Sequence, residues 1–167
     1  KVLLIDMDEE KKSLTNKFFG KSFQDKGFTN MRKESFSLEY AKNCIVRDKQ
    51  YNLEIIPSGN IKENYSENYD KFNDLLSSLS KKYDLILCDT MPITYHPDSL
   101  LISKFANSIL TIRHNSTPIA VVSHIIDEYK KFGYSMPSII FNNIDFSSKR
   151  VFRLLNFVNS GNYSYGY

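Results

Sequence analysis

Four short apolar runs constrain the fold of this chain more than any other feature of its sequence. They are rich in aliphatic and β-branched residues, and they cover residues 2–5, 85–88, 108–112 and 138–141. Apolar runs without alternating polar residues are typical of parallel strands that are covered on both faces. A weaker fifth run, residues 53–56, ends at Pro57. The runs therefore predict a mainly parallel sheet.

Helical patterns separate these strands. The apolar spacing predicts helices over residues 69–82, 99–107 and 119–132, with two shorter ones over 13–19 and 38–44. Alternation of strand and helix predicts the α/β class. In the 119–132 helix, Thr117 fits an N-cap, Pro118 the first turn, and Gly133 a left-handed C-cap.

Composition limits the domain count and the partners. The length of 167 residues and the absence of a Pro/Gly-rich linker predict one domain, which we place at residues 1–158. A net charge of only +3, with scattered lysines, argues against a nucleic-acid partner.

No run approaches the roughly 20 apolar residues of a membrane span. Cys44 and Cys88 lack metal-ligand spacing and are expected to be reduced thiols in a cytoplasmic protein.

The last nine residues, 159–167, differ from the rest of the chain. Tyr163, Tyr165 and Tyr167 alternate with small residues, and no aliphatic residue is present. Such a segment cannot join a core, so we expect a mobile tail. The tail either has no function or presents its tyrosines to an enzyme.

Two of the predicted strands end in carboxylates. Asp6 and Asp8 follow the first strand, and Asp89 follows the run at 85–88. The carboxyl ends of parallel strands form the ligand crevice of an α/β fold, so the three side chains could converge. Carboxylate oxygens at that edge suit Mg²⁺. The alternative is that each Asp ends a strand or caps a helix.

Several motifs, in order, resemble the catalytic domain of bacterial tyrosine kinases of the capsule and exopolysaccharide family. Residues 2–8 (VLLIDMD), with Ser13-Leu14 and Phe18-Phe19-Gly20, resemble the Walker A′ segment, and residues 83–92 (YDLILCDTMP), with Asp98, resemble the Walker B region. Further landmarks lie at residues 27–29, 37–41, 52–59, 117–118 and 141–145. The resemblance covers nearly the whole chain.

This resemblance implies a three-layer, P-loop NTPase-like fold of the deviant Walker, MinD-like type. The phosphate-binding loop, GxxxxGK[ST], does not occur in these residues. In the family that loop precedes the Walker A′ strand by one helix. We therefore expect that the first βα unit, with the Walker A segment, is missing from this chain and lies upstream of Lys1.

The resemblance also implies roles for individual residues. Asp6 matches the carboxylate that accepts the proton of the attacking tyrosine, and Asp8 and Asp89 match Mg²⁺-linked carboxylates. Asn142 matches the residue that contacts the adenine of ATP. The tyrosines of the tail, Tyr163, Tyr165 and Tyr167, match the autophosphorylated cluster. ATP and Mg²⁺ are the implied cofactors.

The partners and the location follow from the resemblance alone. The parent protein is expected at the inner, cytoplasmic face of the cell membrane, with a transmembrane polysaccharide co-polymerase segment or activator. Other partners would be further copies in a ring-like homo-oligomer and a tyrosine phosphatase. Its expected role is control of capsule and exopolysaccharide synthesis and export.

Three departures from the family pattern keep other functions open. The phosphate-binding loop is absent, Glu10 stands where the family has basic residues, and Met91 replaces a proline. These favour a non-catalytic assembly or regulatory relative. A partitioning or division-site ATPase of the ParA/MinD type shares the fold and the paired aspartates, although the tyrosine tail and residues 52–59 argue against it.

Overall fold

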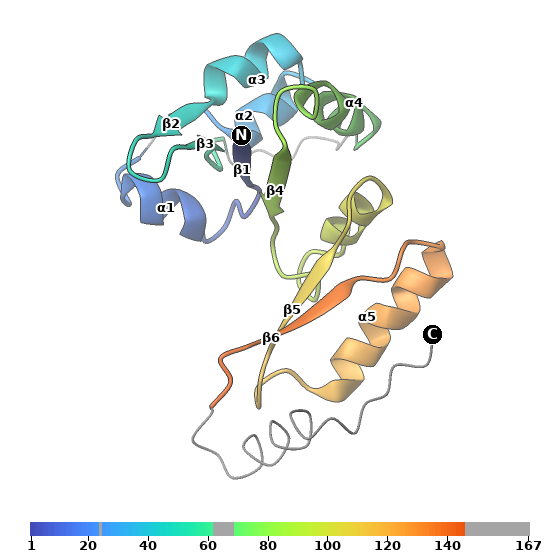
Figure 1. Ribbon diagram of the computed structural model, residues 1–167. Helices are drawn as coiled ribbons and strands as arrows, with labels where there is room; N and C mark the ends of the chain where they lie inside the picture. Colours follow the sequence, from blue (N-terminus) through green and yellow to red (C-terminus); the bar gives the residue numbers. More distant parts are fainter. Residues whose placement is uncertain (24, 62–68, 146–167) are drawn as a thin grey trace. The chain divides into compact units, whose positions relative to one another are not determined.

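The computed structural model forms two compact units, Lys1–Phe105 and Ala106–Tyr167 (Figure 1). The structure describes residues 1–23, 25–61 and 69–145. Each unit is considered by itself, so the single domain over 1–158 stays a prediction. The tail at 159–167 lies outside the described residues.

The first unit is built on a four-stranded sheet with the order β2-β3-β1-β4. The central strand β1 (Val2–Asp6) pairs in parallel with β3 (Leu53–Ile56) and with β4 (Leu85–Asp89). The short strand β2 (Val46–Asp48) is antiparallel to β3. The predicted α/β class and mainly parallel sheet are confirmed.

The helices of this unit follow the predicted order. They are α1 (Ser13–Phe19), α2 (Phe28–Lys33), α3 (Leu38–Cys44), α4 (Tyr69–Leu79) and a 3₁₀ helix, η1 (Pro97–Lys104). The first, third and fourth were predicted. The sequence did not predict α2 or β2, because six and three residues are too few to establish a period. The predicted helix at 99–107 is the 3₁₀ helix instead, a form common in short connections.

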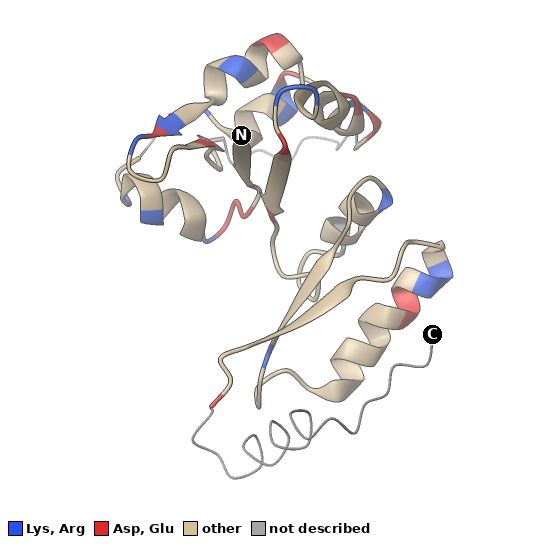
Figure 2. Cartoon of the chain, viewed as in Figure 1, with Lys and Arg blue, Asp and Glu red and all other residues tan. Residues whose placement is uncertain are grey.

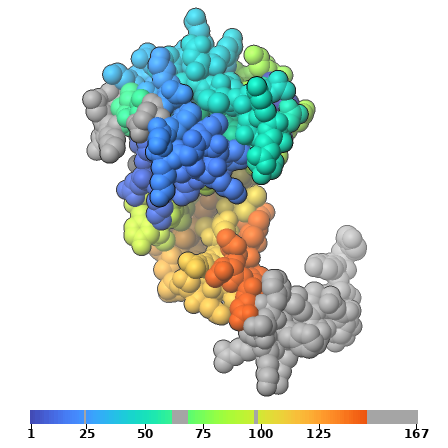
Figure 3. All heavy atoms as spheres, turned by 90° about the vertical axis from the view of Figure 1, so that its left-hand side faces the viewer, coloured from blue at the N-terminus to red at the C-terminus, as the bar shows by residue number. Residues whose placement is uncertain are grey.

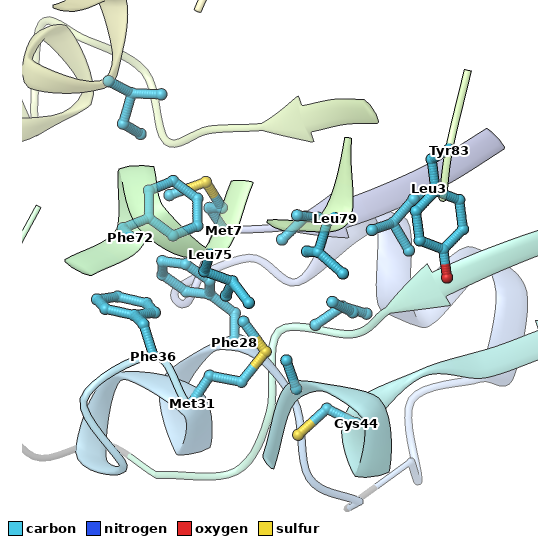
Figure 4. Close-up of a cluster of buried hydrophobic side chains, with 14 residues drawn as sticks. Leu3, Met7, Phe28, Met31, Phe36, Cys44, Phe72, Leu75, Leu79 and Tyr83 are labelled. Carbon is cyan, nitrogen blue, oxygen red and sulfur yellow. The ribbon is translucent and has the colours of Figure 1, made fainter. Parts of the chain in front are cut away.

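One core joins the sheet to α2, α3 and α4. Leu3, Ile5 and Met7 alternate along the chain and so share a face of the sheet. Their partners come from all three helices and from the turn between α2 and α3, which carries Phe36, as Figure 4 shows: Phe28, Met31, Phe36, Cys44, Phe72, Leu75 and Leu79. The rings of Phe28, Phe36 and Phe72 lie 5.1–5.8 Å apart between centroids. Each such buried side chain stabilises the fold by roughly 1.5–3 kcal/mol.

The opposite face of β4 differs from the expectation. Leu85 is 48% exposed and Leu87 is 45% exposed, whereas Ile86 and Cys88 pack against the core. The prediction that this strand is covered on both faces is therefore wrong within the part of the chain that the structure describes. An apolar run shows that a strand can be buried, but not what lies over it.

The second unit contains a βαβ element. Strands β5 (Ile109–Arg113) and β6 (Ser138–Asn142) pair in parallel and are joined through α5 (Ile119–Phe132). The left-handed Gly133 (φ 68°) closes α5, as predicted. The predicted N-cap, Thr117, is wrong: Pro118 occupies that position, and the Thr117 hydroxyl accepts a hydrogen bond from the Arg113 amide at 3.2 Å.

The connection between β1 and β3 forms most of the first unit's face toward the viewer in Figure 3, where it is blue to cyan. Its α2 helix is bonded to the turn at residues 57–59 by two backbone hydrogen bonds, Phe28 N to Pro57 O (2.8 Å) and Thr29 N to Ser58 O (3.0 Å).

Among the described residues, no helix has the length and hydrophobicity to cross a bilayer.

Gly27 is required by this contact, and a Gly27→Ala variant tests it. An added Cβ would lie 2.1 Å from the Pro57 carbonyl oxygen and 2.5 Å from the Gly59 nitrogen, so backbone must move. We expect a loss of roughly 1–3 kcal/mol in the free energy of unfolding, measured by urea denaturation. Gly20→Ala is the control, because nothing lies within 4 Å there and only its positive φ is unfavourable. Equal losses in the two variants would contradict the close approach.

Candidate functional site at the carboxyl edge of the sheet

The ends of β1 and β4 bring the predicted acidic residues together. Asp6 and Asp89 are register partners on these adjacent parallel strands, so their side chains share a face of the sheet. The Met7 amide donates to the Asp89 carbonyl at 2.8 Å and extends the pairing beyond the strands. Figure 2 shows acidic residues (red) in the loop after β1 and at the end of β4. Two of the three predicted carboxylates, those of Asp6 and Asp89, therefore lie on neighbouring strands, and convergence of all three on one site stays a prediction.

Asp6 is the most enclosed of the three carboxylates. Its side chain is fully buried, with 0% exposure. Oδ1 accepts a hydrogen bond from the Asp8 amide at 3.1 Å. Oδ2 accepts from both the amide (2.8 Å) and the hydroxyl (2.6 Å) of Thr15. Burial of a carboxylate is costly unless donors replace water, and these three donors do so.

The bond from the Thr15 amide explains how α1 begins here. The first amides of a helix have no partner within the helix. Lys12, which precedes α1, provides no side-chain cap. The carboxylate of Asp6 takes over that task for Thr15, and its charge is favourable at the helix N-terminus.

Asp8 lies in a tight loop just beyond the strand. It is 8% exposed, and its Oδ1 accepts from the Lys11 amide at 2.9 Å. Its carbonyl accepts from the amide of Lys12, which adopts a left-handed conformation (φ 50°). The Lys12 ammonium then donates to the Gly59 carbonyl at 2.5 Å, which ties the loop to the turn after β3.

Asp89 differs from the other two carboxylates in its exposure. The residue is exposed at the end of β4. Desolvation by the surrounding protein raises the pKa of its carboxyl, and the negative charges of Asp6 and Asp8 raise it further. A bound cation would relieve this repulsion. The donor set therefore suits a divalent cation.

Within the part of the chain that the structure describes, no group of three acidic, His or Cys side chains is close enough to hold a metal ion. Mg²⁺ usually takes only one or two protein carboxylates, with water and phosphate as its other ligands. Asp8 and Asp89 meet that requirement by residue type. Their role as metal ligands stays a prediction.

Each of the two glutamates that follow Asp8 contacts a side chain from another segment of the first unit. Glu9 forms an ion pair with Arg32 of α2. Glu10, which reverses the charge usual in the family, lies 3.2 Å from Nε2 of His96. This contact links the loop after β1 to the segment after β4, and it carries a charge pair when His96 is protonated.

Asn142 ends β6 in the second unit. It is exposed; its carbonyl accepts from the His114 amide at 2.9 Å, and its Oδ1 accepts from the Asn143 amide at 2.8 Å. The position at the carboxyl end of a parallel strand fits a ligand-contacting residue. The structure does not place it relative to the carboxylates, and the predicted acceptors Tyr163, Tyr165 and Tyr167 lie outside the described residues.

The sequence did not predict the contributions of Thr15 and Ser58. Thr15 lies nine positions from Asp6, and Ser58 lies 43 positions from Thr15. The Thr15 hydroxyl accepts a bond from the Ser58 amide at 2.9 Å. Thr15 lies outside the sequence motifs, and the landmark over residues 52–59 contains Ser58 without indicating a contact with Thr15, because only the packing of α1 beside the two strands brings them together.

Comparison with curated proteins shows which proteins have similar sequences. The tyrosine-protein kinase ptk of Acinetobacter johnsonii is 28% identical over 152 residues, which is 89% of this chain and 20% of the kinase. The tyrosine-protein kinase wzc of Salmonella typhimurium is 26% identical over 147 residues, or 86% of this chain and 20% of the kinase. The predicted resemblance to bacterial tyrosine kinases is confirmed. The chain spans about a fifth of the length of these kinases, and no family model matches it.

Solved structures agree on the fold. The kinase domain of the Escherichia coli tyrosine kinase ETK has a TM-score of 0.74 and 21% identity, and the match covers 100% of this chain and 60% of that domain. The MinD cell division protein of Aquifex aeolicus has a TM-score of 0.68 and 18% identity, over 95% of this chain and 64% of MinD. The P-loop NTPase-like, MinD-like fold is confirmed. At these identities the structural likeness shows the fold alone.

The raised pKa of Asp89 predicts a pH-dependent stability difference. A folded-state pKa above the ordinary value of 3.8 means that folding favours the protonated carboxyl. The Asp89 carboxyl therefore contributes a loss of stability as the pH rises through and above 3.8 toward its folded-state pKa, and the Asp89→Asn variant lacks this contribution. Without divalent cations, the variant should be the more stable protein at pH 7. We expect less than about 1 kcal/mol, since solvent screens an exposed group.

Urea denaturation in EDTA at several pH values measures this difference. The exposed Asp74 of α4 provides the control, because Asp74→Asn removes one negative charge away from the site. A gain in Asp89→Asn that does not shrink toward low pH, or that equals the gain in Asp74→Asn, would contradict the repulsion among the three carboxylates.

Proposed function

We propose that this chain is part of an ATP- and Mg²⁺-dependent protein-tyrosine autokinase. The observation that carries the proposal is a coincidence of two findings. Proteins named as tyrosine-protein kinases align with 86–89% of the chain, and the aligned region has a sheet edge where Asp6 pairs with Asp89 and where the charges of Asp6 and Asp8 act on Asp89. Phosphoryl transfer needs such an edge, because it depends on positioning and on neutralisation of charge.

The residues of the edge would divide the work. Asp8 and Asp89 would hold Mg²⁺, which neutralises phosphate charge when it is bound. Asn142 would contact the adenine of ATP. Asp6 is proposed from the family pattern as the proton acceptor for the tyrosine hydroxyl. Asp6 is fully buried, and each of its carboxylate oxygens already accepts a hydrogen bond within the first unit. A substrate tyrosine hydroxyl therefore has no direct access to Asp6 in this arrangement.

The acceptors would be Tyr163, Tyr165 and Tyr167, delivered to the site of a neighbouring copy in a ring-like homo-oligomer. The parent protein would act at the inner face of the cell membrane with a transmembrane polysaccharide co-polymerase segment or activator. A tyrosine phosphatase would reverse the modification. Control of capsule and exopolysaccharide synthesis and export is the proposed outcome, as the family resemblance of the sequence implies.

Two other functions each have an observation in their favour. The fold also matches MinD with a TM-score of 0.68, so a ParA/MinD-type ATPase is the second candidate. The pairing of Glu10 with His96, in place of a basic residue near the phosphates, favours a third candidate, a non-catalytic assembly or regulatory relative.

Mass spectrometry of the full-length gene product, incubated with Mg²⁺-ATP, tests the proposal. We expect ATP-dependent phosphate on Tyr163, Tyr165 or Tyr167. The Asp8→Asn and Asp89→Asn variants should each lose on the order of 100-fold in rate, because each removes charge that would hold the cation. Asp6→Asn should lose the signal as well. Asp74→Asn, which removes an exposed acid of α4, is the control and should remain active.

The other outcomes separate the candidates. Hydrolysis of ATP with no phosphotyrosine would favour the partitioning-type ATPase. No binding of ATP would leave the non-catalytic relative. Phosphotyrosine that persists in both Asp8→Asn and Asp89→Asn would overturn the metal assignment while the kinase activity remained.

A further inference from the structure

Thr15 lies at the centre of a buried hydrogen-bond chain between Asp6 and Ser58. Thr15 itself is not part of the sequence motifs. It is 3% exposed, and it lies in the first turn of α1. Its hydroxyl is 2.6 Å from Oδ2 of Asp6 and 2.9 Å from the amide nitrogen of Ser58. Both neighbours are themselves fully buried, at 0% exposure.

The direction of these bonds is fixed by chemistry. A hydroxyl has one proton to donate, and a backbone amide can only donate. The Ser58 amide therefore donates to the Thr15 oxygen, and the Thr15 proton is directed to the Asp6 carboxylate. Only a hydroxyl can act as acceptor and donor at this position. A methyl group in its place would leave the Ser58 amide and one lone pair of Asp6 without partners.

The two ends of this chain reach different parts of the site. At one end, Oδ1 of Asp6 accepts from the amide of Asp8, the proposed Mg²⁺ ligand. At the other end, Ser58 belongs to the turn after β3. This turn is held by α2 through Phe28 and Thr29, and by the ammonium of Lys12, which precedes α1. Thr15 thus connects the loop that carries Asp8 to the turn after β3, which is bonded to α2 and to Lys12.

A second observation points to this turn. The Ser58 hydroxyl is buried and has no hydrogen-bond partner in the described part of the chain. Buried polar atoms nearly always have partners, so this hydroxyl can accept a water or a ligand group at the turn.

We propose that Thr15 is a positioning residue for phosphoryl transfer, holding the Asp6 carboxylate and through it the Asp8 loop in register with the turn at Ser58. The inference rests on the proposed kinase function. It assigns to Asp6 a positioning task in addition to any proton transfer, because the described arrangement leaves neither of its oxygens without a donor.

The test compares Thr15→Val with Thr15→Ser in the full-length gene product. Val keeps the shape of Thr and removes the hydroxyl, whereas Ser keeps the hydroxyl and removes the methyl group. We expect Thr15→Val to lower kcat for tyrosine phosphorylation about tenfold, since small misplacement at a reacting centre is costly. The KM for ATP should change less than about twofold, and the Mg²⁺ concentration for half-maximal rate should rise. Thr15→Ser should restore both values to near those of the wild type.

Thr29→Val provides a matched control. Thr29 is also 3% exposed, and its hydroxyl accepts from the Ile61 amide at 3.2 Å, just beyond the same turn. It has no bond to Asp6 among those described for the carboxylate. Thr29→Val should lower the midpoint of thermal unfolding about as much as Thr15→Val, and it should leave kcat and the Mg²⁺ requirement unchanged.

Hydrogen exchange provides a second measurement that does not depend on the folding of Thr15→Val. In Asp6→Asn, the side-chain NH₂ group replaces one of the two carboxylate oxygens. It then faces either the donors of Thr15 or the backbone amide of Asp8, and in either case a donor loses its acceptor. The Ser58 amide should therefore exchange at least about tenfold faster than in the wild type, while the Ile61 amide should not.

The outcomes distinguish this inference from the proposed function. No phosphotyrosine in the wild type would overturn both. An active wild type would sustain the kinase function, and the inference would then be wrong if Thr15→Val kept its kcat and Mg²⁺ requirement. It would also be wrong if Thr15→Ser lost as much as Thr15→Val, or if Ser58 exchange were unchanged in Asp6→Asn.

Discussion

The arrangement of the first unit depends on the buried carboxylate of Asp6. A carboxylate removed from water is tolerated only where donors surround it. Asp6 recruits them from the loop after β1 and from the first turn of α1. The same bonds that satisfy its charge also determine where Asp8 lies and where α1 begins. The geometry of the acidic edge therefore follows from the need of the buried Asp6 charge for hydrogen-bond donors.

The acidic edge also shows how the fold concentrates charge. Parallel pairing of β1 and β4 sets Asp6 beside Asp89, and the tight loop returns Asp8 toward them. Desolvation raises the pKa of Asp89, and the charges of Asp6 and Asp8 raise it further. A bound cation would offset this repulsion, which is consistent with the proposed role of the edge in phosphoryl transfer.

The departures from the kinase pattern have a structural context in the described residues. Glu10 does not stand as an isolated negative charge, because it lies against His96 from the segment after β4. Lys12 directs its ammonium to the Gly59 carbonyl, so its charge serves the turn after β3. The basic and acidic residues of the loop are thus used to bind segments of the first unit together.

Prediction from sequence succeeded where the physical signal is local. The bounds of α1, α3, α5 and β3 agree with the pattern of their own residues, and Gly133 closes α5 because only a residue that tolerates positive φ suits that position. It failed for α2 and β2, which are too short for a period, and for the N-cap of α5, where Thr117 bonds to Arg113 instead.

The sequence by itself determined the α/β class, the parallel strands and the acidic residues that end two of them, because strand periodicity and strand order place those residues at one edge. Only the tertiary structure decided which of the three carboxylates is buried and which is exposed. It alone connected Asp6 through Thr15 to Ser58, across 43 positions of chain between the last two. Hydrogen bonds between distant segments depend on how helices pack on the sheet, and no local pattern in the sequence encodes that packing.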